Sequence, residues 1–508
     1  MERGSEGRRS ERMSDPLMDP PTKDRSALKN KIVAAISNLS TAYNLTIVAS
    51  VNAVLKNQYC TLTRHFEGVD PFGKDVYSMK FDGKCKAAGD FAKVACIIGA
   101  IVGQVFMGYV GDCLGRSNAL RLTMALSIGG ALLSAFAFPT SSDPLMVLYT
   151  FGIARLILGV GVGGVYPLAA TVAAESSETK SRGAWTSFVF SMQGIGNILG
   201  PLVLLIFANI LNPDNDIGQP SHIGWAWRCA IAFGAVPGLC IAPFKTKETQ
   251  KKATDNEGKS SSQNCASYCR ALGQRQYWFS LVGTAGCWFL FDITFYGNSL
   301  FAPVVLGAVF STGANNNTNT TDIKNIVGSD LSHNLCLQLI VVALMALPGY
   351  YVALALMDKM GRKIMQAMGF FMMTVVYTIV GVLIHLQFDV KNSTFSVPAW
   401  ALMALYGLTY FFSNFGPNST TFILPSETFP PEVRTTLNGV SAAAGKVGAA
   451  IGVAAFPYVV SALGKGFTLV VCGGVSMLGF IITLIFVKDM RGKAMTGSEE
   501  LREEPLLD

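Results

Sequence analysis

The 508-residue sequence predicts an all-α membrane protein with twelve transmembrane helices in two pseudo-symmetric six-helix bundles. Three observations predict this fold class. Half of the residues are hydrophobic and only 14% are charged. Apolar runs of about 20 residues, the length that crosses a bilayer, recur along the chain. Finally, a set of charged loop motifs in the first half is repeated in the second half, which predicts two related bundles. The apolar runs make the lipid bilayer the expected surrounding of the protein.

Six predicted helices fall in each half of the chain, and they end where polar or charged residues interrupt the apolar runs. In the first half they cover residues 30–55, 91–111, 118–139, 145–174, 184–209 and 225–243. In the second half they cover residues 278–304, 335–356, 364–387, 397–424, 435–463 and 466–488. The predicted N-terminal bundle is thus 30–243, and the predicted C-terminal bundle is 278–488.

Residues 244–277 are charged and polar, which predicts a solvated cytoplasmic linker between the bundles. Basic side chains gather in the even-numbered loops, as the positive-inside rule expects of cytoplasmic loops. They are Arg116, Lys180, Arg182, Lys359, Arg362, Lys363 and Arg434. Both tails, 1–29 and 489–508, are then cytoplasmic. The net charge of +7 follows from this topology, so no nucleic-acid partner is expected.

The predicted outer loops agree with that orientation. Asn316, Asn319 and Asn392 each begin an N-x-S/T sequon, which favours a glycoprotein. Cys60 and Cys85 flank the first outer loop and could form a disulfide. Four other cysteines lie in predicted helices and are interpreted as buried thiols: Cys96, Cys287, Cys336 and Cys472. The four histidines have no metal-ligand spacing, so neither a metal nor another cofactor is predicted.

Charged motifs follow the second, fourth, eighth and tenth predicted helices, and the later two repeat the earlier two. One pair shares the pattern Asp-x-x-Gly-Arg, and the other pair shares a Glu and an Arg seven residues apart. Acidic and basic side chains at helix ends can pair with each other and with helix termini, so a charge clamp that holds one conformational state is expected. The residues are Asp112 and Arg116, Glu175 and Arg182, Asp358 and Arg362, and Glu427 and Arg434.

Asp292 and Lys446 are full charges inside stretches that are otherwise apolar enough to cross a membrane. A charge at mid-bilayer costs at least about 2.5 kcal/mol, so it normally faces a polar cavity and serves a function. Trp288 and Tyr296 lie four residues to either side of Asp292, and in a helix all three share one face. This face predicts a solute-binding site.

The loop motifs resemble the charge clamps of the major facilitator superfamily, whose two six-helix halves rock about a central site. Five segments further resemble its phosphate:proton symporter family, which includes fungal and plant high-affinity phosphate transporters. They are GVGVGGVYPLAATVAAE at 159–175, SMQGIGN at 191–197, WFLFDITFY at 288–296, GRKIMQAMGFFMMT at 361–374, and 411–449, which begins FFSNFGPNS and ends SAAAGKVGA. The resemblance implies a phosphate site lined by Tyr166, Gln193, Trp288, Asp292, Tyr296, Asn418 and Lys446.

The chemistry of these side chains suits phosphate. Lys446 supplies a compact positive charge, and the tyrosines, the tryptophan and the two amides can donate hydrogen bonds to a tetrahedral oxyanion. Asp292 repels an anion unless that anion brings a proton, which phosphate does near neutral pH and sulfate does not. Asp292 could therefore select phosphate over sulfate, or carry a proton itself.

Two segments depart from the family pattern. Members usually have an acidic residue just before the tyrosine of the fourth helix, where this chain has Val165. Their first helix usually contains TDAYD, and residues 40–44 here are STAYN. Three acidic positions associated with proton movement are therefore neutral. This favours a facilitator or an exchanger, with proton coupling through Asp292 as the alternative.

The predicted function is transport of inorganic phosphate by alternating access, in a protein that is not an enzyme. Protons are further partners if coupling is retained, and a monomer is expected. Two alternatives stay open: a transporter of organic phosphates such as glycerophosphodiesters, and a phosphate sensor that does not transport. The plasma membrane is favoured, and the C-terminal EEPLLD, which resembles an acidic dileucine signal, keeps an endosomal or vacuolar membrane as the alternative.

Overall fold

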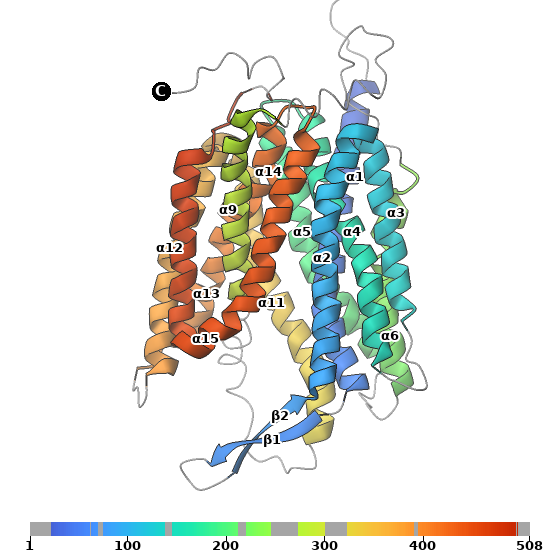
Figure 1. Ribbon diagram of the computed structural model, residues 1–508, viewed down its shortest axis with the longest axis vertical. Helices are drawn as coiled ribbons and strands as arrows, with labels where there is room; N and C mark the ends of the chain where they lie inside the picture. The colour runs from blue at the N-terminus through green and yellow to red at the C-terminus, as the bar shows by residue number, and fades with distance from the viewer. Residues whose placement is uncertain are drawn as a thin grey trace, which may run out of the picture.

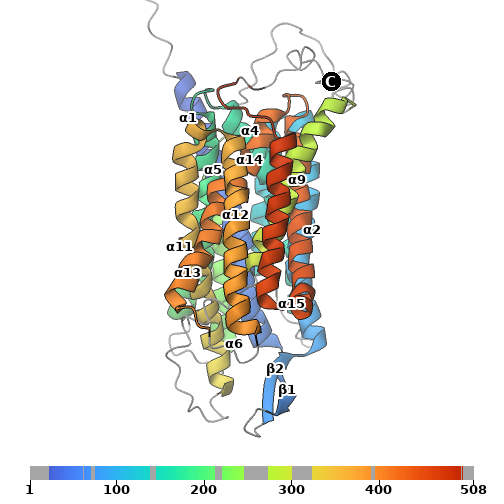
Figure 2. The ribbon, with the colours of Figure 1, turned by 90° about the vertical axis from the view of Figure 1, so that its left-hand side faces the viewer.

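The computed structural model describes residues 22–60, 62–69, 75–137, 145–211, 220–244, 273–299, 323–390, 395–493 and 495. In these residues the chain is helical except for one β-hairpin and the connecting turns. The helices run along a common direction in two groups, one from each half of the chain, and the hairpin projects from one end (Figure 1). Figure 2 shows the group from the second half in front. The predicted helical fold class with two bundles is confirmed.

The first half of the chain supplies six spans, all near their predicted positions. They are α1 (Thr22–Tyr59), α2 (Gly83–Leu114), α3 (Arg116–Ala135), α4 (Met146–Glu175), α5 (Arg182–Leu211) and the pair α6 (Pro220–Phe233) and α7 (Val236–Ile241). The last pair was predicted as one uninterrupted helix over 225–243. The structure divides it at Gly234 and Ala235, because α7 begins with Pro237 in its first turn and proline has no backbone N–H for the helical ladder.

The second half also supplies six spans. They are α9 (Arg275–Ser299), α11 (Ile323–Met360), α12 (Arg362–Ile384) with the π-helical turn η2 (His385–Asp389), α13 (Ala399–Ser413) with the π-helical turn η3 (Asn414–Asn418) and α14 (Ser419–Thr428), and α15 (Arg434–Phe486). α15 contains two spans, because the chain reverses at Gly464. Its φ of +82° is a conformation that residues with a Cβ rarely adopt.

Nine helices in the described residues are long and apolar enough to cross a bilayer. α15 is one of them and supplies two spans, and α3 and the α13–α14 helix complete the twelve. The helix predicted over 397–424 continues to Thr428 and is interrupted at η3, where Phe415 and Gly416 leave helical geometry. This interruption lets α12 approach, because a Cβ on Gly416 would lie 2.6 Å from the Cα of Gly369.

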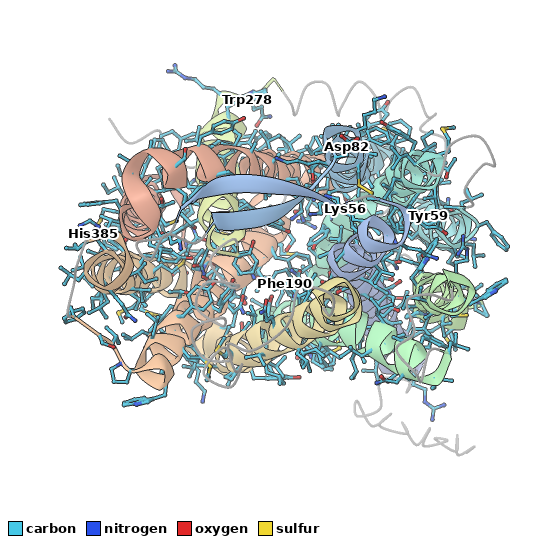
Figure 3. All side chains as sticks on the ribbon, turned by 90° about the horizontal axis from the view of Figure 1, so that it is seen from below. Lys56, Tyr59, Asp82, Phe190, Trp278 and His385 are labelled. Atoms are coloured by element: carbon cyan, nitrogen blue, oxygen red, sulfur yellow. A yellow bond between two sulfur atoms is a disulfide. The ribbon has the colours of Figure 1, made fainter. Side chains whose placement is uncertain are left out.

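The sequence analysis did not predict the β-hairpin between α1 and α2. Its strands, β1 (Leu62–Val69) and β2 (Asp75–Phe81), are antiparallel, with a register irregularity between Phe66 and Gly68. The proposed disulfide between Cys60 and Cys85 is confirmed, and it ties the base of the hairpin to the start of α2. In Figure 3 it lies close to Asp82 and Lys56.

Two ends of the helical bundle can be distinguished. The hairpin end carries β1 and β2, and the clamp end carries the eight predicted clamp residues. Asn30 near the start of α1 donates to Ser176, just after α4, and Arg491 after α15 donates to the carbonyl of Lys359. The start of α1 and the segment that follows α15 therefore both lie at the clamp end.

Some predictions fall outside the described residues. These are the three sequons at Asn316, Asn319 and Asn392, and most of the linker predicted over 244–277. The four cysteines predicted as buried thiols are confirmed: Cys96, Cys287, Cys336 and Cys472 are buried and free.

Candidate functional site

The seven residues implied by the family resemblance come from α4, α5, α9, η3 and α15, well inside the helical bundle. Five of them are buried, and Gln193 and Tyr296 are half-buried. Six are linked through direct contacts between their side chains. The seventh, Asn418, is linked to them through Tyr350, Phe190 and Phe422, whose ring packs against Tyr166. Sequence positions that lie far apart thus form one polar neighbourhood.

A buried ion pair lies at the centre of this neighbourhood. The Nζ atom of Lys446 is 3.3 Å from Oδ2 of Asp292 and donates a hydrogen bond of 3.1 Å to the hydroxyl of Tyr296. It also lies 5.5 Å from the ring centroid of Tyr166. Each buried charge is therefore compensated by the other. An ammonium has three donors, so one remains for a substrate oxygen.

Small residues on α15 bring this pair together. A Cβ on Gly448 would clash with the backbone carbonyl of Phe289, and a Cβ on Gly445 would clash with the indole of Trp288. The two glycines flank Lys446 and allow α15 to lie close against α9. The lysine side chain therefore reaches Asp292 across a short gap between the helices.

The first half of the chain contributes uncharged donors. The hydroxyl of Tyr166 donates to Oε1 of Gln193 at 3.3 Å, a contact that uses the carbonyl oxygen and leaves the amide N–H groups of Gln193 as donors. The ring of Tyr166 packs edge-on against Trp288 at 6.5 Å between centroids. The aromatic contact joins the two halves of the chain beside the ion pair.

Asn418 was expected to donate to the substrate, and the structure shows both of its amide hydrogens engaged. Nδ2 donates to Oδ1 of Asn414 at 2.6 Å and to the hydroxyl of Tyr350 at 3.1 Å. The hydroxyl hydrogen of Tyr350 is then available to a substrate. Sequence reasoning missed both partners. Asn414 was detectable, because it lies four residues before Asn418, a spacing that places two side chains on one helix face.

An aromatic layer closes the site toward the clamp end. Phe190 of α5 packs against Phe422 at 4.6 Å and against Tyr350 at 5.7 Å between ring centroids. Phe190 lies near the middle of the molecule in the view from the hairpin end (Figure 3). Because Phe190 and Phe422 belong to different halves, the layer must part before a solute can pass.

The first of two charge clusters joins α2 and α4 to α15. Asp112 at the end of α2 accepts the backbone N–H groups of Thr435 and Thr436 at 3.2 and 2.7 Å, at the beginning of α15. Glu175 pairs with Arg434 at 2.8 Å and with Arg116 at 3.4 Å. A carboxylate at a helix N-terminus is stabilised by the unpaired N–H groups and the helix dipole.

The second cluster repeats this arrangement with the halves exchanged. Asp358 at the end of α11 accepts the backbone N–H groups of Gly183 and Ala184 at 3.0 and 2.8 Å, at the beginning of α5. Oε1 of Glu427 accepts from Arg182 at 2.9 Å and from Arg362 at 2.8 Å. All eight predicted clamp residues thus take part in two related networks, and each network connects the two halves.

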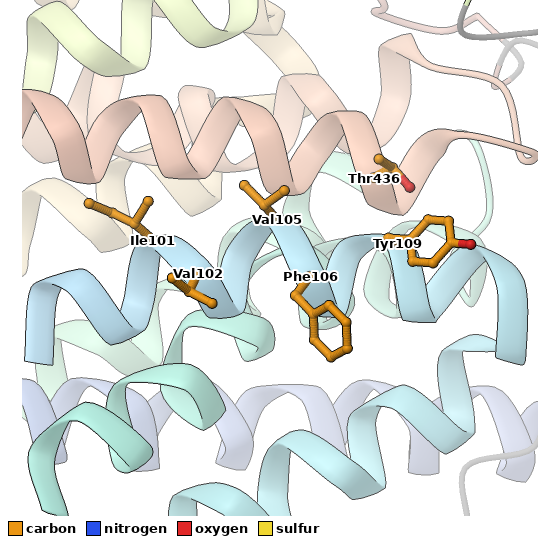
Figure 4. A pocket seen from close by; sticks show the side chains of 6 residues that line it. All are labelled: Ile101, Val102, Val105, Phe106, Tyr109 and Thr436. Carbon is orange, nitrogen blue, oxygen red and sulfur yellow. The ribbon is translucent and has the colours of Figure 1, made fainter. Parts of the chain in front are cut away.

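A shallow groove lies elsewhere, on the outer face of α2 (Figure 4). Its volume is about 580 Å³, and none of its lining residues belongs to the central site. The lining is Ile101, Val102, Val105, Phe106, Tyr109 and Thr436. Apart from Tyr109 and Thr436 it is apolar, which suits contact with lipid rather than with a charged solute.

The family model described as "Sugar (and other) transporter" matches residues 31–501. Inorganic phosphate transporter 1-11 of Oryza sativa subsp. japonica is 31% identical over 506 residues, which covers 91% of this chain and 86% of that protein. Inorganic phosphate transporter 1-6 of the same plant is 32% identical over 459 residues and covers 80% of this chain and 83% of that protein.

Solved structures show a similar fold. The proton:xylose symporter XylE bound to 6-bromo-6-deoxy-D-glucose has a TM-score of 0.68 at 19% identity, with 95% of this chain and 100% of that chain covered. The E. coli fucose:proton symporter has a TM-score of 0.59 at 12% identity and covers 90% of this chain and 100% of that chain. Because the family model matches nearly the whole sequence, this protein belongs to the sugar (and other) transporter family of the major facilitator superfamily, a family of membrane transporters rather than enzymes.

Proposed function

We propose that this protein transports inorganic phosphate across a membrane by alternating access. The observation that carries the proposal is the buried Lys446–Asp292 pair, which is surrounded by uncharged donors from both halves of the chain. The names of the relatives support the same substrate, since both rice proteins are called inorganic phosphate transporters.

The geometry suggests how a phosphate would bind. One phosphate oxygen would accept the remaining N–H of Lys446, and others would accept from Gln193, Trp288 and the hydroxyl of Tyr350. A protonated phosphate oxygen would donate to Asp292, so the carboxylate would stabilise the anion instead of repelling it. Sulfate carries no proton at neutral pH and would face the full repulsion, which gives a physical basis for discrimination.

Alternation would use the two charge clusters. The clusters, together with the aromatic layer of Phe190 and Phe422, would hold the clamp end closed. Opening that end would separate Asp112 from α15 and Asp358 from α5, and the hairpin end would close in exchange. The moving bodies would be the bundles 30–243 and 278–488, with 244–277 as the linker.

The clamp end would face the cytoplasm. Lys and Arg residues are concentrated in the loops at this end, as the positive-inside rule expects. Both termini would then be cytoplasmic, and the hairpin with its disulfide would lie on the oxidising exterior or lumenal side. The plasma membrane is the compartment we favour.

Proton coupling would be weak. Val165, Thr41 and Asn44 stand where the family usually has acidic residues, and all three are buried. The amide nitrogen of Asn44 donates to the backbone carbonyls of Ser40 and Gly234 at 2.9 and 3.0 Å, so this position is filled by a neutral helix-to-helix contact. Facilitated diffusion or exchange is therefore the favoured mode.

Flux of labelled phosphate in proteoliposomes tests the proposal, with the pH gradient imposed, reversed and abolished. We expect saturable flux in all three conditions that excess unlabelled phosphate inhibits and sulfate does not. Transport of a glycerophosphodiester without transport of phosphate would overturn the choice of substrate. Saturable phosphate binding with no flux would instead identify a sensor.

A further inference from the structure

Arg155 is a buried charge that the proposed transport mechanism does not use. It lies on α4, and its side chain is completely buried. Tyr166 of the central site follows eleven residues later on the same helix, which corresponds to about 16 Å along the axis. Arg155 therefore belongs to a different region, closer to the hairpin end.

The polar contacts of Arg155 are few. Nη1 donates to the backbone carbonyl of Asn44 at 3.2 Å, and the guanidinium lies 4.9 Å from the ring centroid of Phe151. Nε and Nη2 have no hydrogen-bond partner among the described residues. Among the residues that the structure describes, no Asp or Glu forms an ion pair with Arg155.

Other fully buried arginines in this protein are paired. Arg182 and Arg362 share Glu427, and Arg434 reaches Glu175, all at 2.8 to 2.9 Å. A guanidinium cannot lose its proton to relieve the cost of burial, so it needs a compensating negative charge. Arg155 receives only a carbonyl dipole and an aromatic face, which supply part of that compensation.

The neighbouring side chains are neutral and partly aromatic. Tyr43 donates its hydroxyl to the carbonyl of Ala230 at 2.6 Å, and Phe151 packs edge-on against Trp227 at 6.2 Å. Such surroundings, with one cation that offers two N–H donors, suit a compact anion that is easily dehydrated. A phosphate or sulfate ion would require more donors than the site offers.

We propose that Arg155 binds a small monovalent anion of the chloride class, at a structural site separate from the phosphate site. The anion would accept hydrogen bonds from Nε and Nη2 and neutralise the buried guanidinium between α1 and α4. Because folded protein would bind the anion and unfolded protein would not, chloride would stabilise the fold in a saturable manner.

Thermal unfolding of the purified full-length protein in chloride or in gluconate, at equal ionic strength, tests this site without reference to transport. We expect the melting temperature to be higher in chloride by about 2 °C or more, with saturation as chloride is increased. Bromide should act like chloride, and sulfate should not. Equal melting temperatures in chloride and gluconate over the whole titration would overturn the proposal.

Two variants connect the effect to Arg155. Asn44→Asp places a carboxylate on the residue whose backbone carbonyl already contacts the guanidinium, so the chloride shift should become smaller. The variant also loses the hydrogen bonds that the amide donates to Ser40 and Gly234, so the chloride shift, and not the absolute melting temperature, is the readout. Arg155→Gln should also be insensitive to chloride. Lys446→Ala is the matched control, since it alters the central site and should keep the chloride shift. A shift that persists in Arg155→Gln would contradict the assignment.

Labelled chloride provides a second measurement if either variant fails to fold. Equilibrium binding of ³⁶Cl⁻ to the native protein should be saturable and displaced by bromide. It should survive the addition of phosphate, because the two sites are separate. The absence of saturable binding, or full displacement by phosphate at its own binding affinity, would overturn a separate chloride site. The first result would leave ordered water as the partner of Arg155, and the second would assign the chloride to the central site.

Discussion

The clamp end and the central site of this transporter are built on different plans. At the clamp end the two halves contribute equally, because Asp112 contacts the start of α15 and Asp358 contacts the start of α5 in the same way. At the central site both charges come from the second half, on α9 and α15, and the first half offers uncharged donors. The two halves are thus related by pseudo-symmetry at the clamp end but not at the central site.

This difference has a mechanical consequence. Ion pairs join the two halves at the clamp end, so we expect the state that is closed there to be stable without substrate. At the centre, the ion pair lies within one half, and the ring of Tyr166 contacts Trp288 and Lys446 from the other half. A bound anion would add a charged link between the halves. A substrate held by Lys446 on one side and by Gln193 on the other would then draw the halves into an occluded state.

Removal of the central positive charge should have the largest effect. Lys446→Ala leaves Asp292 buried and unpaired, and the loss of one partner of a buried ion pair costs about 3–5 kcal/mol. Phosphate affinity should fall at least about a hundredfold, and flux in proteoliposomes should nearly vanish. Lys446→Arg should also be poor, because a planar fork does not take the place of a compact ammonium in the buried position beside Asp292 and Tyr296. Near-normal phosphate affinity in Lys446→Ala would show that the site is misplaced.

The clamp clusters are similar in pattern, and we expect their strengths to differ. Each glutamate contacts two arginines, but the contacts of Glu427 are 2.8 and 2.9 Å and those of Glu175 are 2.8 and 3.4 Å. The side chain of Glu427 is also fully buried, whereas that of Glu175 is 15% exposed. Glu427→Gln should therefore shift the protein toward the state that is open at the clamp end more strongly than Glu175→Gln does. Spin labels at the exposed positions Lys180 and Lys359 would report the distance between the halves. An equal change of distance in the two variants would contradict the expected difference in strength between the two clusters.

The sequence was sufficient to predict the parts that depend on local composition. Twelve spans follow from apolar runs, and the clamp motifs follow from their repetition. The partners could not be predicted, because Asp112 and Asp358 each contact a helix from the other half of the chain, and only the packed fold brings those helices together. The reversal at Gly464 was predicted, because it falls between the helices expected over 435–463 and 466–488. The division before Pro237 was not predicted, because other prolines, such as Pro167 and Pro201, lie inside uninterrupted helices.

The polar contacts of the site were harder to predict than its members. The spacing could have indicated Asn414 as one partner of Asn418, but it could not indicate Tyr350 or the use of both amide hydrogens, since hydrogen-bond saturation is a property of the packed site. The lack of a carboxylate beside Arg155 could not be predicted either, because the neighbours of its guanidinium are determined by the packing of helices that are distant in the sequence.

Neutralising Asp292, the acid of the central ion pair, should change the selectivity for phosphate over sulfate more than the rate of phosphate transport. Asp292→Asn keeps the size and most of the hydrogen bonding and removes the negative charge that repels a fully ionised oxyanion. Sulfate should then compete with phosphate about tenfold better or more, and phosphate uptake should depend less on pH. Competition assays in proteoliposomes across a range of pH measure both effects. Unchanged exclusion of sulfate would mean that Asp292 does not select the substrate.

The smallest expected effect concerns proton coupling, where the first half of the chain has lost its acids. Because Val165 and Asn44 are neutral, phosphate flux down its own gradient should persist when the pH gradient is abolished, and accumulation against a gradient should be weak. Val165→Asp adds a carboxyl beside Tyr166 and should increase the stimulation by an inward proton gradient, while Val165→Asn controls for size and polarity. Proton and phosphate fluxes measured together in the same vesicles give the stoichiometry. At least one proton per phosphate in the unmodified protein, with steep accumulation, would place the coupling on Asp292, so that the charged second half would bind phosphate and also carry the proton.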